Sequence, residues 1–237
     1  MIVGMVLAAG QSSRLGRPKQ LLPLHGEALL RYTVRNILAS ALNEVLVVVG
    51  HEADAVRAAI AGLPVAIVVN ADAALGQSTS LVAGIRALPT ETAAAIVLLG
   101  DQPSIDPAVI NALIAAWRNT GAPLVAPKYR NGLGNPVLFD RSIFPELMAL
   151  KGDTGARPIV RAQRRAGTLH QVPVAGTTPS DVDTDDDYAA LLASLPPATP
   201  PGSTCSRVRK WCHAEERGIS AASRVRSQKN EIPPASE

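Results

Sequence analysis

The first twenty-two residues constrain the fold more than any other part of the chain. They open with an apolar run, Ile2–Ala9, which stops at Gly10 and gives way to a polar loop. A run of this length that is rich in Val and Ile and ends at glycine is typical of a buried strand in a parallel sheet. Open α/β sheets bind ligands at the carboxyl ends of such strands, so we expect a ligand at this loop.

The loop itself predicts a site for a polyphosphate. Gly10 and Gly16 allow backbone angles that turn several N–H groups inward, and the same stretch carries three cations, Arg14, Arg17 and Lys19. Two better-known phosphate loops are excluded by spacing. The P-loop pattern G-x-x-x-x-G-K-[ST] does not fit, because Gly16 follows Gly10 too late and Arg17 comes next, and the dinucleotide pattern G-x-G-x-x-G is absent.

Apolar runs and helical patterns alternate along the first half of the chain. The sequence predicts strands at 2–9, 45–49, 65–69 and 94–99, and helices at 28–41, 53–61, 78–88 and 107–118. Such alternation is typical of parallel βαβ units, hence of a Rossmann-like α/β fold with helices on both faces of a mostly parallel sheet. Beyond residue 126 the pattern becomes mixed, with a loop at 131–134, strands at 136–139 and 169–174, and helices at 142–150 and 156–166.

We therefore expect one domain over residues 1–195. Residues 1–127 would form a nucleotide-binding lobe, and residues 128–195 an acceptor-binding lobe. Residues 196–237 are rich in Pro, Ser, Thr and Arg and poor in large apolar residues, which predicts a disordered basic tail.

The distribution of charge argues against nucleic acid as a partner. The 237-residue chain has a formal net charge of +3, but residues 196–237 alone hold seven basic and four acidic residues, so residues 1–195 are neutral. Aromatic residues make up only 3% of the chain, which leaves few platforms for base stacking. The expected domain thus lacks the basic footprint of a nucleic-acid-binding protein.

Cysteine usage and hydropathy predict a cytoplasmic protein without a membrane partner. Both cysteines, Cys205 and Cys212, fall in residues 196–237, so residues 1–195 cannot form a disulfide. No apolar run is long enough to span a membrane, and no basic residue precedes the opening run as it would in a signal peptide.

Asp101 lies just past the strand predicted at 94–99, and hence at the same sheet edge as the opening loop. A carboxylate that faces a phosphate site is placed to hold Mg²⁺, which is usually bound by one or two carboxylates together with substrate phosphates. The alternative is that Asp101 caps the helix that begins near Pro107, or the turn at Pro103.

The acidic run at 181–187 supplies a second candidate ligand. Thr184 and Asp187 have the spacing of a helix N-cap, and the later acids suit the first turn of the helix that follows. Asp181 and Asp183 precede that helix and could face the same cation as Asp101, so we expect Asp183 to be the second Mg²⁺ ligand. A solvated charge run is the alternative.

Two further loops offer candidate ligand contacts. The loop after the third predicted strand contributes the nucleotide-binding candidates Asn70, Gly76, Gln77, Ser78 and Ser80, through close backbone approach and polar side chains. A helix capped by Ser78 is an alternative that is compatible with binding. In the back lobe, Arg157 suits a bidentate contact with an anionic acceptor, although an exposed arginine at a helix start is equally consistent.

Three motifs occur in the order and spacing of a known family: LAAGQSSRLGRPK at 7–19, GDQP at 100–103 and DVDTDDDY at 181–188. The chain resembles the MobA/MocA-like nucleotidyltransferases of the nucleotide-diphospho-sugar transferase superfamily, and most closely the molybdenum cofactor cytidylyltransferases. GNPVLF at 134–139 and GDTGAR at 152–157 narrow the resemblance to that branch. Two motifs depart from it: GDQP stands where GDMP is usual, and Asp185 and Asp186 replace Pro-Glu, while Asp183 is kept.

The resemblance implies contacts for each substrate. The nucleobase would lie against Leu7, Ala8, Ala9 and Gly10, the triphosphate would contact Arg14 and Lys19, and Asp101 would hold Mg²⁺. The back-lobe motifs place a pterin acceptor near Gly134, Asn135, Asp153, Gly155 and Arg157. Ala9 stands where related guanylyltransferases tend to carry glycine, which favours CTP.

The implied activity is Mg²⁺-dependent transfer of CMP from CTP to a phosphorylated acceptor of the molybdopterin type, with release of pyrophosphate. Arg14, Lys19 and Asp101 would be its catalytic residues, acting through positioning and charge neutralisation. A client molybdoenzyme would then be a partner. Two alternatives stay open, namely a nucleotidyltransferase with another NTP or a sugar-phosphate-type acceptor, and a non-catalytic carrier of the cofactor.

Overall fold

A computed structural model of the chain describes residues 1–12 and 15–194. The described residues belong to one compact unit. Arg14 and the tail predicted at 196–237 lie outside the described residues, so the expectations for them stay predictions.

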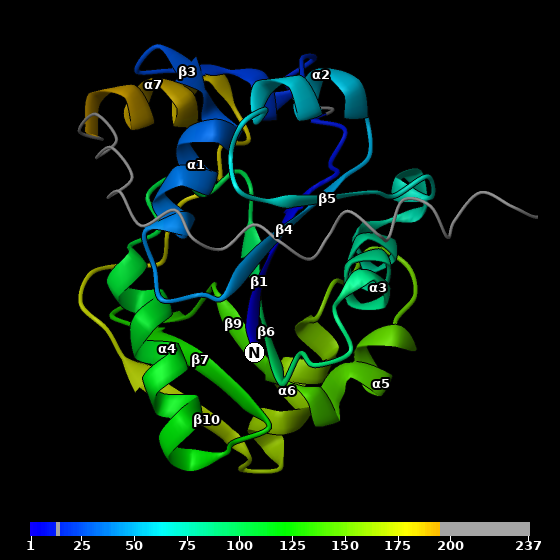
Figure 1. The fold of residues 1–237 in the computed structure, drawn as a ribbon. Coiled ribbons are helices and arrows are strands. Elements are labelled where there is room, and N and C mark those ends of the chain that lie inside the picture. Colours follow the sequence, from blue (N-terminus) through cyan, green and yellow to red (C-terminus); the bar gives the residue numbers. More distant parts are fainter. Residues whose placement is uncertain (13–14, 195–237) are drawn as a thin grey trace, which may run out of the picture. The chain divides into compact units, whose positions relative to one another are not determined.

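A mostly parallel sheet forms the centre of the described residues, with β1 in its interior (Figure 1). Its strand order is β10-β7-β9-β6-β1-β4-β5, and the short β8 pairs with β7. Along this order β9 runs antiparallel to both β6 and β7, whereas the other neighbours are parallel. The strands are β1 (Ile2–Ala8), β4 (Glu44–Val49), β5 (Ala66–Val69), β6 (Ala94–Leu99), β7 (Leu124–Tyr129), β8 (Gly132–Leu133), β9 (Val137–Asp140) and β10 (Leu169–Pro173).

Helices cover both faces of this sheet, so the predicted α/β fold with a mixed back half is confirmed. The α-helices are α1 (Leu29–Leu38), α2 (Ala53–Ala59), α3 (Gln77–Ala87), α4 (Pro107–Thr120), α5 (Phe144–Met148), α6 (Arg157–Arg165) and α7 (Asp185–Ser194). Three 3-10 turns, η1 (Lys19–Leu21), η2 (Ala73–Leu75) and η3 (Arg141–Ile143), and a hairpin of β2 (Pro23–Leu24) and β3 (Glu27–Ala28) complete the described elements.

The alternation of side chains along β1 divides the core into two layers. Val6 packs with residues of α1, α2 and α4 on one face of the sheet, and Met5 packs with residues of α3, α5 and α6 on the other. Because every second side chain of a strand points to the same face, a strand that is apolar throughout must be covered on both faces. Gly84 of α3 lies so close to Met5 that a Cβ there would overlap the sulfur atom, which lets α3 pack tightly on β1.

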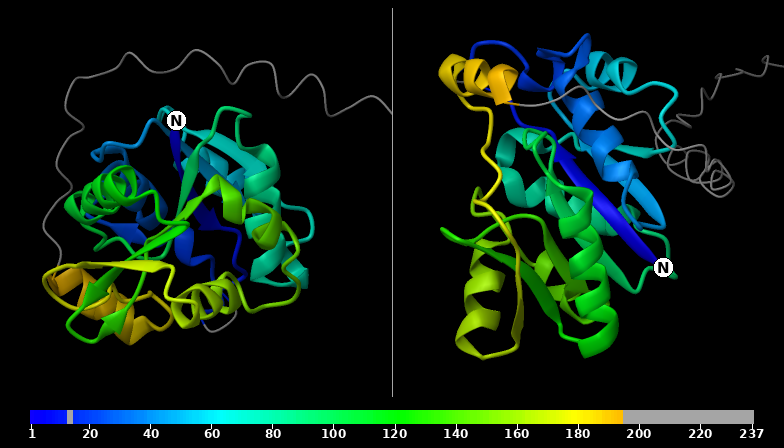
Figure 2. Two further views of the ribbon diagram at one scale, coloured as in Figure 1. Left: turned by 90° about the horizontal axis from the view of Figure 1, so that it is seen from below. Right: turned by 90° about the vertical axis from the view of Figure 1, so that its left-hand side faces the viewer.

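A third apolar cluster attaches α7 to the beginning of the chain. Val182 and Leu191 pack there with Leu24, Leu29 and Tyr32. Figure 2 shows α7, in orange, beside the blue hairpin and α1. This packing returns the acidic run at 181–187 to the opening loop, although some 160 residues separate them in sequence.

One strand escaped the sequence-based prediction. β7 lies within Leu124–Tyr129, where the pattern was interpreted as weakening, because Pro127 and Lys128 interrupt the apolar run. Proline normally argues against an interior strand, since it cannot donate to the ladder. Here the Pro127 carbonyl still accepts from the amide of Gly134, at 3.4 Å. The segment 131–134 was expected to be a loop, but it contains β8.

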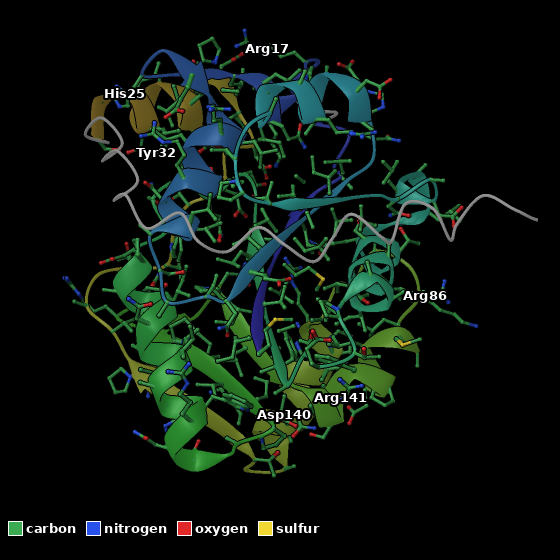
Figure 3. The ribbon with its side chains drawn as sticks, viewed as in Figure 1. Arg17, His25, Tyr32, Arg86, Asp140 and Arg141 are labelled. Carbon is green, nitrogen blue, oxygen red and sulfur yellow. The ribbon has the colours of Figure 1, made fainter. Side chains whose placement is uncertain are left out.

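The amino end of the sheet carries polar contacts that serve the fold. The Asp140 carboxylate accepts from the indole of Trp117 at 3.0 Å and from the amide of Ser142 at 2.9 Å, and Arg141 donates to the carbonyl of Thr92 at 2.9 Å. Figure 3 shows Asp140 and Arg141 at the end of the sheet opposite to Arg17. These residues fasten β9 and α4, away from the edge where the site is expected. Among the described residues, no helix is both long and apolar enough to cross a membrane.

Candidate active site

The opening loop and Asp101 leave adjacent strands at the same edge of the sheet, as predicted. β1 and β6 are parallel neighbours with Leu7 opposite Leu99, and the amide of Gly100 donates to the carbonyl of Leu7 at 2.9 Å. A Cβ on Gly100 would come within 2.9 Å of Leu30 and 3.2 Å of Ala8. Glycine therefore lets the chain turn closely beside β1 before it presents Asp101.

Lys19 joins the two predicted carboxylates. Its ammonium donates to Asp101 and, at 2.9 Å, to Oδ1 of Asp183. The side chains of Lys19 and Asp101 are only 15% and 16% exposed. Burial lowers the pKa of the Lys19 ammonium, but the charge of Asp101 and the hydrogen bonds from both carboxylates outweigh it, so the pKa is raised. Lys19 is thus a fixed positive charge at the centre of the site.

The carboxylate of Asp101 does not serve the helix that follows. Asp106 is the N-cap of α4, where its side chain accepts from the amide of Ala108 at 2.8 Å. The capping alternative for Asp101 is therefore not what the structure shows.

Val182 fixes the acidic segment beside Asp101. Its side chain is 2% exposed, inside the third apolar cluster, and its amide donates to the carbonyl of Asp101 at 3.2 Å. Asp183 follows directly and reaches Lys19. The predicted cap of the next helix is confirmed, because Thr184 Oγ1 accepts from the amide of Asp187 at 3.1 Å and Asp187 accepts from the amide of Thr184 at 2.9 Å.

Gln102 positions the first acid of this segment. The buried side chain donates to Oδ1 of Asp181 at 2.7 Å and to the carbonyl of Pro179 at 3.3 Å. Burial and the nearby charge of Asp101 raise the pKa of the Asp181 carboxyl, while the bond from Gln102 opposes the shift. The position at which GDQP departs from GDMP thus holds a side chain that a methionine could not replace as a donor.

Gln20 supports the turn that follows β1. It is 4% exposed, and its amide nitrogen donates to the carbonyls of Ala8 and Gly10, each at 3.1 Å. The two bonds tie η1 back onto the end of the strand. Sequence reasoning missed this residue, and its signal was modest: a single polar side chain between Lys19 and an apolar pair.

One pocket brings together residues from both expected lobes. It is lined by Leu7, Ala8, Ala9, Gly10, Lys19, Gln20, Gln77, Ser80, Leu99, Gly100, Asp101, Arg157 and Asp181. Nine of these were predicted as binding or catalytic residues, and Arg157 is the one among the nine that was assigned to the acceptor. The guanidinium of Arg157 makes no hydrogen bond or ion pair within the described part of the chain. It is available to an anion.

Two predicted nucleotide contacts are instead occupied within the protein. The amide nitrogen of Asn70 donates to Thr79 at 2.8 Å and to Ser80 at 3.0 Å, and its oxygen accepts from the amide of Asp72 at 3.0 Å. Ser78 is fully buried, lies in the first turn of α3, and does not line the pocket. Gly76, not Ser78, is the N-cap residue of α3.

The loop 152–155 packs against the start of α3. The amide of Gln77 donates to Oδ1 of Asp153 at 3.0 Å, and the amide of Ser78 donates to the carbonyl of Gly152 at 3.2 Å. A Cβ on Gly76 would lie 2.7 Å from that carbonyl, and one on Gly155 would lie 2.5 Å from the Gln77 side chain. Gly76, Asp153 and Gly155 therefore join the back lobe to α3, whether or not they also touch a ligand.

Gly134 and Asn135 contact other parts of the protein. A Cβ on Gly134 would lie 2.6 Å from the methyl group of Thr178, and the Asn135 carbonyl accepts from the hydroxyl of Tyr129 at 2.9 Å. Burial, together with the charge of Asp106, raises the pKa of Tyr129 to about 12. Neither residue lines the pocket, so their contact with an acceptor stays a prediction.

The donor set at this edge fits Mg²⁺ bound together with substrate. No three His, Cys, Asp or Glu side chains gather into a metal centre in residues 1–12 and 15–194. Asp101 and Asp183 nevertheless converge on one cationic group, the ammonium of Lys19. Two carboxylates are what a protein usually contributes when phosphates complete the magnesium coordination.

The fold and this edge define a nucleotidyltransferase, and comparison with known proteins identifies the family. Residues 4–167 match the MobA-like NTP transferase domain, and the chain belongs to that family.

Two characterised proteins are similar over nearly their whole lengths. Purine catabolism protein PucB of Bacillus subtilis (strain 168) is 33% identical over 205 residues, which are 82% of this chain and 97% of PucB. Nicotine blue oxidoreductase of Paenarthrobacter nicotinovorans is 32% identical over 203 residues, 81% of this chain and 96% of the relative.

A solved structure shares the fold. Rv0371c of Mycobacterium tuberculosis H37Rv, in complex with manganese, superposes with a TM-score of 0.72 and 34% identity. The match covers 82% of this chain and 99% of Rv0371c.

Proposed function

We propose that the protein transfers a nucleotidyl group, most specifically CMP from CTP, to a phosphorylated acceptor of the molybdopterin type and releases pyrophosphate. The observation that carries the proposal is the single pocket in which the turn after β1, Lys19 and Asp101 lie together with Arg157 of the other lobe. A nucleotide and an acceptor phosphate can both contact such a pocket.

In this reaction the terminal phosphate of the acceptor attacks the α-phosphorus of CTP. A new P–O bond forms, the bond between the α-phosphorus and the bridging oxygen breaks, and pyrophosphate leaves with its electron pair. The acceptor phosphate is already anionic, so the protein has no proton to remove. Catalysis then depends on positioning and on the neutralisation of charge.

Residues at the pocket divide these tasks. The turn Ala8–Gly10, held by Gln20, would receive the base, and Lys19 would bind the phosphates and stabilise the leaving pyrophosphate. Arg157 would orient the acceptor phosphate. Arg14 is proposed for the triphosphate on the ground of the family resemblance alone.

Asp101 and Asp183 would hold Mg²⁺, which when bound neutralises phosphate charge and supplies Lewis-acid chemistry. The convergence of the two carboxylates on one cationic group supports this assignment. The manganese complex of Rv0371c supports a divalent ion in the family.

The proposed base and acceptor rest on different observations. Ala9 lines the pocket, and the branch of the family that carries alanine at this position tends to use CTP. The acceptor assignment follows the motifs at 134–139 and 152–157. The rival acceptor is a sugar-phosphate-type compound, which the same nucleotide contacts would serve.

Two other functions are less well supported. A non-catalytic carrier would not need a buried lysine bound to two acids, whereas this chain has one. The name of the relative nicotine blue oxidoreductase suggests redox chemistry, but this chain lacks the G-x-G-x-x-G pattern of a dinucleotide-binding oxidoreductase.

The proposal is tested with Asp101→Asn, which keeps the shape of the side chain and removes its charge. We expect transfer of the nucleotidyl group, followed by mass spectrometry of the product, to fall about a hundredfold or more, with an unchanged unfolding midpoint. Asp54→Asn, on the exposed first turn of α2, is the matched control and should keep full activity. Equal activity in the two variants would refute the role of Asp101.

A further inference from the structure

The arrangement of charges at the site suggests a role for Lys19 before any substrate binds. Its ammonium donates to Asp101 and Asp183, the two carboxylates proposed to hold the metal. It therefore stands where a divalent cation would have to bind. A cation shared by two acids and a divalent ion on the same acids repel each other, so both cannot occupy the place fully.

We propose that Lys19 is the counter-ion that holds the Asp101 and Asp183 carboxylates together in the nucleotide-free protein, and that it competes with the divalent cation for them. Nucleotide binding would resolve the competition, because its phosphates offer the ammonium new acceptors and free the carboxylates. The inference rests on the proposed function for the identity of the nucleotide and the metal.

The surroundings of the acids explain why a counter-ion is needed. The charge of Asp101 contributes to the raised pKa of Asp181, which shows that neighbouring acids at this edge feel each other strongly. Asp101 is largely buried, so water cannot screen its charge well. Val182, anchored between Asp181 and Asp183, prevents the acidic segment from moving away to relieve the repulsion.

Lys19 is also built to leave. Its backbone is anchored, because its amide donates to the hydroxyl of Ser12 at 3.0 Å and it begins the turn η1. Its side chain has a flexible four-carbon stem and lines the pocket. A rotation of the side chain alone would carry the ammonium from the acids to phosphates in the pocket, without a movement of the loop.

The exposed pair of Arg17 and Asp185 provides a matched control. It lies on the same two segments, with Nη2 to Oδ1 at 2.7 Å, but both side chains are more than half exposed. Replacement of Arg17 changes the net charge as replacement of Lys19 does, and leaves Asp101 and Asp183 untouched.

The test measures binding of Mn²⁺ alone to the full chain, by electron paramagnetic resonance and without nucleotide. We expect Lys19→Met to bind Mn²⁺ about tenfold or more tightly than the wild type, and Lys19→Arg and Arg17→Met to bind as the wild type does. Asp101→Asn in the Lys19→Met background should abolish the gain. Mn²⁺ should also raise the unfolding temperature of Lys19→Met and not that of the wild type.

Equal Mn²⁺ affinity in Lys19→Met and the wild type would overturn the inference, as would the same gain in Arg17→Met or a lack of Mn²⁺ binding in every variant. Should Lys19→Met fail to fold, Lys19→Gln takes its place. The assay needs no turnover, so it is independent of the proposed function. An Asp101-dependent gain without any nucleotidyl transfer would refute that function alone, and transfer without the gain would refute the counter-ion role alone.

Discussion

Replacement of Gln20 by methionine probes the support of the turn after β1. Methionine fills nearly the same volume but cannot donate to the carbonyls of Ala8 and Gly10, which the Gln20 amide reaches at 3.1 Å each. Two hydrogen bonds of about 1 kcal/mol each are lost, and two carbonyls lose their donor at a buried site, so we expect a loss of about 2–3 kcal/mol. Part of this loss should appear as disorder of the turn.

Two measurements separate the effects. Urea unfolding should give the loss in the free energy of unfolding, with Gln171→Met on an exposed position of β10 as the control. If the turn pays about 2 kcal/mol to become ordered around the base, the KM for the nucleotide should rise by about 20- to 30-fold. The KM for the acceptor should change little. A stability within about 0.5 kcal/mol of the wild type, with an unchanged nucleotide KM, would refute the support role.

Three other substitutions test separate parts of the account. Gly76→Ala places a Cβ 2.7 Å from the backbone of Gly152, at a φ of 115°, and should lower the free energy of unfolding by about 2 kcal/mol in urea; an unchanged midpoint would contradict the close packing of α3 on that loop. Val182→Ala should cost about 2 kcal/mol and, because the acidic segment loses its anchor, should also weaken Mn²⁺–nucleotide binding in calorimetry; a loss of stability alone would separate the two roles. Ala9→Gly should shift the ratio of kcat/KM values from CTP toward GTP, and an unchanged ratio would remove Ala9 as the determinant of the base.

The elements that the sequence predicted well carry strong local signals. The strand at 94–99 was predicted with the bounds that β6 has, because an unbroken apolar run ends at glycine. Pro107 marked the start of α4, and Thr184 with Asp187 marked the cap of α7. β7 was missed because Pro127 and Lys128 hide it, and only its pairing with β9 and β10 reveals it.

The site was predictable where topology alone decides it. Parallel strands end at one edge, so the positions of the opening loop and Asp101 follow from the order of elements. The roles of Gln20 and Gln102 were not predictable, because their partners are carbonyl groups and a carboxylate that only the folded chain brings near. Asp153 was interpreted as an acceptor contact, yet it binds the amide of Gln77 at the start of α3. Such a contact between lobes leaves no periodic signal in the sequence.

The central claim is tested most directly by the release of pyrophosphate from the full chain with Mg²⁺. CTP, GTP, ATP and UTP are each supplied with and without molybdopterin as the acceptor. The account predicts release from CTP that depends on the acceptor, and much less from the other three nucleotides. Release at similar rates from all four, release without the acceptor, or no release at all would contradict it.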